Sequence, residues 1–182
     1  LEFTIEPIHA PKLVKSLENQ VLDAETNETR TLDLTQYFTD PDGEVLSYVT
    51  QVETGSTAST TVSNNTLTIK ALTYGQTAVA VTAMDAHGET VKSSFSLLNR
   101  NTSLPVDLYP NPVTDYMTVR PTQDGTFLIQ FYNQAGSKVL EESIQAGLYQ
   151  PYRLNVSSLA SGLYTVVVDG NGINYRAAIM KL

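Results

Sequence analysis

Short runs in which apolar and polar residues alternate recur along the whole chain, and no run shows the longer period of an amphipathic helix. In "TFLIQFY", for example, Phe127, Ile129 and Phe131 fall on one face of an extended segment, because successive side chains of a strand point to opposite sides. The abundance of Thr, Val and Tyr agrees with this pattern, since these residue types suit a pleated surface. The sequence therefore predicts an all-β protein.

Turn signals divide the first half into pieces of strand length. The run "TRTLDLTQYF" is expected to be a strand that ends before Asp40-Pro41-Asp42-Gly43, where Pro and Gly suit a type I turn. Asn64-Asn65 supplies a tight turn, and a further turn over Asp85 to Gly88 joins two alternating runs. About seven half-buried antiparallel strands at this spacing are typical of a β-sandwich.

The second half restarts the alternation after two closely spaced prolines. Pro110 and Pro112 fix their own backbone angles and restrict the residues before them, so Tyr109 to Pro112 cannot be helix or central strand. The Asp-Gly and Asn-Gly pairs within 169–172 predict a hairpin, and the chain is expected to finish as a strand. The sequence thus predicts a second antiparallel sandwich.

A polar stretch, "LNRNTSLP" (98–105), separates the two halves and resembles a linker between compact units. We therefore predict two tandem domains, 1–101 and 102–182. The first segment, Leu1 to Pro11, carries neither an initiating Met nor a charged-then-apolar export signal, so we expect the chain to be a piece of a longer parent.

Composition excludes several function classes. With 11 Lys and Arg against 19 Asp and Glu, the net charge of -8 opposes a nucleic-acid partner. The chain has no Cys, which rules out disulfides, thiolate metal sites and a cysteine nucleophile. No apolar stretch approaches the roughly 20 residues that cross a bilayer, so no membrane-spanning segment is expected.

No constellation of nucleophile, base and acid is evident. The chain has only two histidines, His9 and His87, and His87 is assigned to a turn beside Asp85. Glu141 and Glu142 are adjacent, and neighbours on a strand point to opposite faces, so they cannot act on one bond. We therefore expect no catalytic residues within this chain.

Calcium is the better chemical candidate. Asp40, Asp42 and Glu44 alternate within one turn, and carboxylate oxygens are the ligands that Ca²⁺ selects. Asp85 would add a ligand only if the fold brings the two loops together. The alternative is ordinary turn chemistry, which the same Asp-Pro-Asp-Gly residues also explain.

Residues 11–98 resemble the bacterial cadherin-like or immunoglobulin-like modules, through "DLTQYFTDPDGEVLSY" early and "VTAMDAHGET" late. The resemblance implies architecture: such modules serve as spacers, adhesive units or carbohydrate contacts. The tyrosines of both halves could form a sugar platform, although sandwiches also use Tyr at half-buried positions.

Four motifs near the C-terminus occur in the order of a second family: "YPNP", "FYNQAGSKV", "LNVSSLASGLYTVVV" and a final strand ending in "KL". Together they resemble the C-terminal sorting domain of the type IX secretion system, the Por secretion tail of Bacteroidetes. The resemblance implies an immunoglobulin-like sandwich that the outer-membrane translocon reads and a sortase-like peptidase removes. By position, the residues that match the family's recognition motifs are Tyr109, Pro110, Asn111, Pro112, Gly136, Gly162, Tyr164 and Lys181.

These patterns predict a non-catalytic C-terminal region of a larger exported protein, at the cell surface or secreted, whose parent could be a protease or another hydrolase. Its partners would be the type IX translocon and the sortase-like peptidase. The alternative is a calcium-assisted adhesion module whose loops bind a glycan or a protein.

Overall fold

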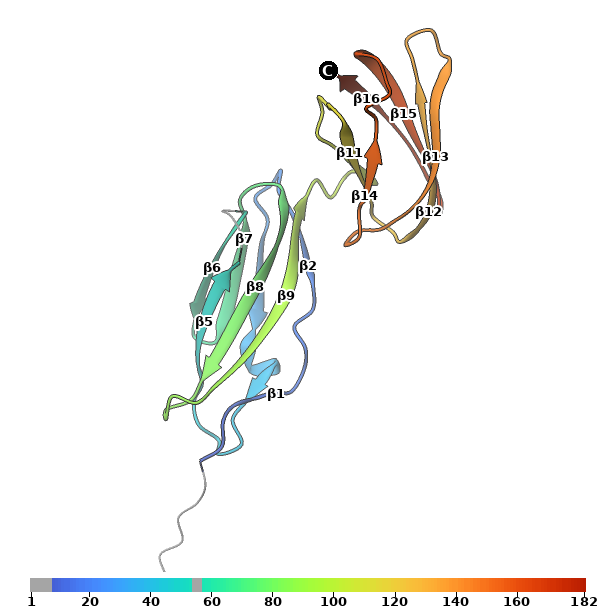
Figure 1. Ribbon diagram of the computed structural model, residues 1–182. Helices are drawn as coiled ribbons and strands as arrows, with labels where there is room; N and C mark the ends of the chain where they lie inside the picture. Colours follow the sequence, from blue (N-terminus) through green and yellow to red (C-terminus); the bar gives the residue numbers. More distant parts are fainter. Residues whose placement is uncertain (1–7, 54–56) are drawn as a thin grey trace, which may run out of the picture. The chain divides into compact units, whose positions relative to one another are not determined.

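The computed structural model describes residues 8–53 and 57–182, and it divides into two compact units between Thr102 and Ser103 (Figure 1). Within the described residues, the only helix is a single 3-10 turn, and none has the length and apolarity that a membrane span requires. Both units are built from β-sheets packed around a core of their own, which confirms the all-β, tandem immunoglobulin-like architecture. Residues 1–7 of the segment examined for an export signal lie outside the described part.

The described residues of the N-terminal unit, 8–53 and 57–102, form nine strands in three sheets. One sheet has the order β2-β9-β8-β5, a second has the order β3-β7-β6, and β1 pairs with β4. All its pairings are antiparallel except that of β2 with β9. The strands are β1 (Lys12–Leu13), β2 (Gln20–Asp23), β3 (Thr29–Asp33), β4 (Phe38–Thr39), β5 (Ser47–Val52), β6 (Ala58–Ser63), β7 (Thr66–Ala71), β8 (Gly75–Met84) and β9 (Thr90–Arg100).

Apolar residues at alternate positions of the strands form the core of this unit. Leu67 and Ile69 of β7 are buried, as are Val79 and Val81 of β8 and Phe95 of β9. Asn64 and Asn65 have positive φ and join β6 to β7 as a two-residue turn. The alternating apolar residues of β7 and β8 therefore share the inward face.

Two segments differ from the sequence prediction. The run after Thr29 does not continue as a strand to Asp40: β3 ends at Asp33, whose side chain accepts the amide of Thr35 and caps a 3-10 turn, η1 (Leu34–Gln36). In addition, 98–100 is not linker but the end of β9. It is buried there, and the amide of Asn99 donates to the carbonyl oxygens of Thr57 and Thr73.

The C-terminal unit has two antiparallel sheets, with the orders β10-β11-β14 and β13-β12-β15-β16. Phe127, Ile129 and Phe131 of β12 face inward and are fully buried. The predicted hairpin is present, since Asn171 and Gly172 join β15 to β16. The strands are β10 (Val106–Tyr109), β11 (Tyr116–Pro121), β12 (Gly125–Tyr132), β13 (Lys138–Ala146), β14 (Tyr152–Asn155), β15 (Gly162–Gly170) and β16 (Ile173–Lys181).

Asp23 binds Thr102, the last residue of the N-terminal unit, through hydrogen bonds. Its Oδ2 accepts the hydroxyl (2.5 Å) and the amide (3.1 Å) of Thr102, and its Oδ1 accepts the amides of Glu25 and Thr26. The Thr102 hydroxyl, followed by the Thr26 amide, lowers the pKa of Asp23 from 3.8 to about 2. The ionised carboxylate is therefore the form that the folded unit stabilises.

This lowered pKa predicts an acid-sensitive contribution to stability. It is fully present above the unfolded value of 3.8 and is lost as the pH falls toward about 2, because over this range the unfolded state takes up a proton while the folded carboxylate stays ionised. We expect the melting temperature of the full chain to fall over this window, and to fall less in Asp23→Asn. Calorimetry from about pH 5 to pH 2 measures both, with Asp124→Asn as control; equal slopes for wild type and Asp23→Asn would contradict the assignment.

Candidate functional site

The "YPNP" motif follows β10, which is an edge strand of its sheet. Tyr109 is 40% exposed, and the guanidinium carbon of Arg120 lies 5.6 Å from the centre of its ring. The peptide bonds before Pro110 and Pro112 are cis. Pro110 to Pro112 are exposed, so the motif forms a surface segment beside the last strand.

Asn111 and Val113 bind the outer edge of β16. The Asn111 side chain donates from Nδ2 to the carbonyl of Ala178 (3.0 Å) and accepts the amide of Met180 at Oδ1 (2.9 Å). Val113 donates its amide to the carbonyl of Met180 (2.8 Å) and accepts the amide of Leu182 (2.9 Å). The first and last motifs of the unit, far apart in sequence, thus share one hydrogen-bonded edge.

Gly136 occupies the turn between β12 and β13. Asn133 organises this turn: its Oδ1 accepts the amides of Ala135 and Ser137, and its carbonyl accepts the amide of Gly136. Gly136 has φ +77°, a left-handed conformation that glycine adopts without strain. Beyond the turn, a hydrogen bond and the charge of Glu141 raise the pKa of Lys138, so this lysine stays charged and paired.

Tyr164 of the "GLY" motif is an anchor of the core. Its side chain is 8% exposed, its ring meets the Phe131 ring edge-on at 6.2 Å, and its hydroxyl donates to the carbonyl of Ala160 (2.8 Å). A buried tyrosine that bonds back to the chain a few residues upstream is typical of immunoglobulin-like domains. Tyr164 therefore stabilises the fold, and this packing role is independent of any recognition of the motif by the export machinery.

Lys181 is buried and lies between two other motif segments. In the ladder it faces Gly162 of β15, and on its other side it forms a bridge to Val113. The turn that contains Gly136 follows Tyr132, which pairs with Thr165. The eight matching residues therefore gather at one end of the unit, where the C-terminus and the 133–137 and 110–115 loops lie (Figure 1).

A shallow groove of about 680 Å³ runs along the outer face of β12, β15 and β16, from the turn that contains Gly136 to Asp169 and Asn174 near the β15–β16 hairpin. Gly136, Leu163 and Tyr164 line it, together with the opposite charges of Asp169 and Arg176. Gly136 and Tyr164 thus border one concave surface, whereas Tyr109 to Pro112 lie at the neighbouring edge.

The candidate acids and bases do not converge in the C-terminal unit. Glu141 contacts Lys138 and Gln130, whereas Glu142 accepts the hydroxyl of Tyr152 at 2.6 Å. Their partners differ because neighbouring residues of β13 point to opposite faces, as expected from the sequence.

The candidate calcium ligands of the N-terminal unit are distributed over two loops. Asp42 is paired with His9, whose backbone amide and ring lower the pKa of the Asp42 carboxyl. Glu44 and Asp85 do come together, and the third member of their group is His87. The sequence predicts only that His87 lies in a turn. Its position two residues after Asp85 is the one local sign that it could join Glu44 and Asp85.

The sequence of residues 107–181 matches the family model of the secretion system C-terminal sorting domain, the Por secretion tail. The match covers the C-terminal unit from β10 to the end of β16 and includes all eight of the residues gathered at its end. It agrees with the resemblance inferred from the four motifs. No match was found among the curated proteins.

Solved structures show distant likenesses of fold. Latent PorU from Porphyromonas gingivalis is 16% identical with a TM-score of 0.33, over 96% of this chain and 20% of that chain. The titin fragment A168169 is 10% identical with a TM-score of 0.44, over 95% and 98%. The endo-fucoidan hydrolase MfFcnA4 is 13% identical with a TM-score of 0.44, over 98% and 29%. Similarities this low carry no argument about function.

The chain spans a fifth of the length of the PorU chain that it resembles. The family match to the C-terminal unit is therefore the finding that identifies its role. Domains of this family mark proteins that the type IX system exports to the cell surface or secretes. Residues 107–181 are a Por secretion tail sorting domain, and the chain that carries it is an exported protein.

Proposed function

We propose that the C-terminal unit is the export signal read by the type IX outer-membrane translocon, and that a sortase-like peptidase then removes it. The observation that supports this proposal is the gathering of the eight motif residues at one end of a unit that matches the sorting family. The exposed "YPNP" segment is fixed to β16 by Asn111, so a receptor would meet a preformed surface.

The N-terminal unit would serve as a spacer or adhesive sandwich between this signal and the rest of a larger parent. Neither type of unit is catalytic, so any hydrolase activity would belong to another part of the parent. The domains we propose are those predicted from the sequence, 1–101 and 102–182; the two compact units meet one residue later, between Thr102 and Ser103.

A reporter fusion tests the export proposal. Ser103–Leu182 has its own core and is fused to a fluorescent reporter in a Bacteroidetes host. We expect surface or secreted fluorescence in the intact strain and retention in a strain that lacks the translocon. Equal delivery in both strains would contradict the proposed function.

Asn111→Ala tests whether the translocon recognises the exposed 109–112 segment itself or requires only a folded unit. Loss of its two exposed hydrogen bonds is expected to lower stability by about 1–2 kcal/mol and to reduce export of the fusion. Tyr164→Phe is the matched variant, since it removes one hydrogen bond inside the unit and leaves the exposed edge intact. Export and denaturant unfolding are measured for both; export that follows stability alone would exclude a recognition role for Asn111.

A further inference from the structure

Two loops of the N-terminal unit are built on the same five-residue turn. Residues 40–44 and 85–89 both read Asp-x-x-Gly-Glu. In the first, Oδ1 of Asp40 accepts the amides two and four positions on, at 2.8 and 3.3 Å. In the second, Oδ1 of Asp85 accepts the corresponding amides, both at 2.9 Å. Each turn therefore uses one carboxylate oxygen of its aspartate.

The other carboxylate oxygen of Asp85 is buried and has no hydrogen-bond partner among the described residues. The side chain is only 5% exposed, so water does not readily replace the missing partner. An anionic oxygen buried in this way is unfavourable unless a donor or a cation meets it. Oδ2 of Asp40 is in the same state.

The turn itself does not require a carboxylate. The C-terminal unit makes the same turn at 133–137 with Asn133, whose Oδ1 accepts the amides two and four positions on, both at 3.0 Å. A neutral amide therefore suffices for the turn geometry. The second oxygen of Asp85, with its negative charge, needs another explanation.

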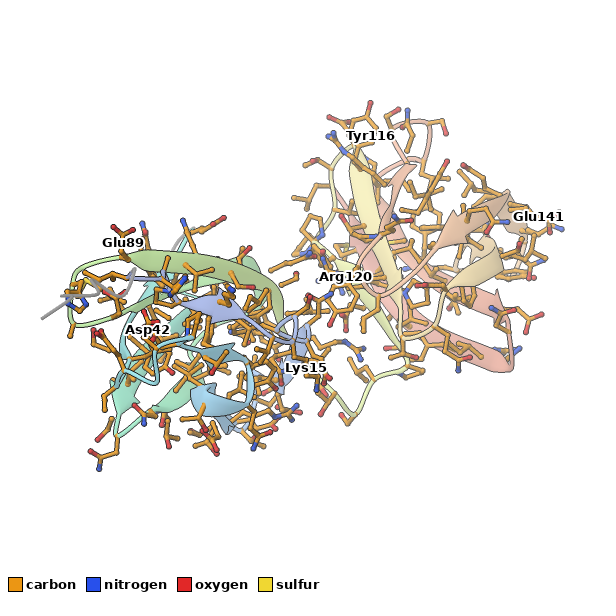
Figure 2. The ribbon with its side chains drawn as sticks, turned by 90° about the horizontal axis from the view of Figure 1, so that it is seen from below. Lys15, Asp42, Glu89, Tyr116, Arg120 and Glu141 are labelled. Carbon is orange, nitrogen blue, oxygen red and sulfur yellow. The ribbon has the colours of Figure 1, made fainter. Side chains whose placement is uncertain are left out.

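Glu44 and His87 place two further side chains that can ligate a metal ion beside Asp85. Strand β5 pairs with β8 so that Ser47 faces Met84, which brings the two turns to the same end of the sheet. Figure 2 labels one residue of each turn, Asp42 and Glu89, both in this unit. Glu44 accepts the amide of Ala86 at 3.0 Å and lies 2.9 Å from Nδ1 of His87. One ligand atom each from Glu44, Asp85 and His87 lies within 4.8 Å of the others.

We propose that Glu44, Asp85 and His87 bind one first-row divalent metal ion, with Zn²⁺ as the probe. Two carboxylates and one imidazole are a donor set that Zn²⁺ accepts, with water at a fourth position, whereas Ca²⁺ takes six to eight oxygen ligands. The imidazole therefore selects a transition metal over the calcium expected from the acidic residues alone. The ion would take the place of the Glu44–His87 contact and would satisfy the buried oxygen of Asp85.

The test uses the full chain, purified without a polyhistidine tag and treated with a chelator. Calorimetric titration with ZnCl₂ is expected to show one ion per chain, and Zn²⁺ is expected to raise the melting temperature. Removing a ligand in His87→Ala or Asp85→Asn should weaken binding by at least the roughly 10- to 100-fold that loss of an outer-shell partner costs. Asp85→Asn retains the turn acceptor, as Asn133 shows, so its fold is expected to persist.

His9→Ala and Asp40→Asn are the matched controls. His9 is the other histidine, and Asp40 occupies the same turn position and also has a buried unpaired oxygen, but neither belongs to the three-residue group. We expect both variants to bind Zn²⁺ as the wild type does. The proposal is overturned if Zn²⁺ does not bind, if either control weakens binding as much as His87→Ala, or if Ca²⁺ binds more tightly and independently of His87. None of these outcomes depends on the sorting function.

Discussion

Replacing Tyr164 by alanine is expected to lower the unfolding free energy of the C-terminal unit by about 3–5 kcal/mol, the cost of removing a large aromatic side chain from a packed core. The side chain is buried against Phe131, and its hydroxyl donates to the carbonyl of Ala160. Both the packing and the hydrogen bond are lost in this variant. Urea denaturation of the full chain, followed by circular dichroism, measures the change.

Two variants at the same place separate the contributions to that loss. Tyr164→Phe keeps the ring and loses only the hydrogen bond, for which we expect about 0.5–1.5 kcal/mol. Leu163→Ala changes the neighbouring residue, which is 42% exposed on the opposite face, and should cost far less than Tyr164→Ala. A loss in Leu163→Ala as large as in Tyr164→Ala would show that Tyr164 is not the anchor of this strand.

Gly170→Ala is expected to destabilise the same unit by roughly 2–5 kcal/mol, from backbone strain combined with overpacking. An added Cβ at Gly170 would lie 2.4 Å from the carbonyl oxygen of Thr126 and 3.1 Å from Cα of Phe127. Both are backbone atoms of the neighbouring strand β12, so no side chain can rotate away to make room. The φ of Gly170, +152°, is also one that other residues rarely adopt.

Gly172→Ala, two residues further on, is the control for this prediction. Gly172 has φ +77°, and nothing lies within 4 Å of an added Cβ, so only the conformational strain remains. We expect a cost of about 1 kcal/mol, which is the usual penalty for alanine in a left-handed conformation. Thermal unfolding of the two variants compares them directly; equal destabilisation would mean that the close approach of β12 and β15 has no energetic effect.

The strand faces of both units could be predicted from the sequence, because alternation reports burial directly. Phe127, Ile129 and Phe131 recur at every second position, and all three are buried. The Asn64-Asn65 turn was also predictable, since asparagine tolerates the positive φ that a tight hairpin needs. In these places the local sequence and the tertiary structure favour the same conformation.

The prediction failed where a local capping interaction or a long-range contact decided the structure. Leu34 continues the alternation of β3, yet Asp33 captures the amide of Thr35 and begins a 3-10 turn. Asn99 looks like a linker residue, but its side-chain Nδ2 donates to carbonyl oxygens 26 and 42 positions away. A polar residue with distant partners gives no local signal of burial.

The site residues likewise fall into two groups: those that a local motif identifies and those that only a long-range contact brings together. The motifs around Asn111 and Tyr164 could be recognised by their order in the chain, but their gathering at one end depends on the bridge from Val113 to Lys181. The role proposed for His87 was missed because its candidate metal partner Glu44 precedes it by more than forty positions. Sequence order identifies motifs, whereas the pairing of β5 with β8 brings these particular side chains together.

The contacts of Asn111 and Val113 with β16 also determine when this unit can finish folding. The Asn111 side chain binds backbone groups 67 and 69 positions later, and Val113 accepts the amide of Leu182. During synthesis these partners appear only after every other strand of the unit has been made, and such distant pairings form slowly. Until residues 178–182 have been added, Asn111 and Val113 therefore lack these partners. A chain that stops before residue 178 would leave both residues without them, whereas the completed unit joins 111–113 to this stretch of β16.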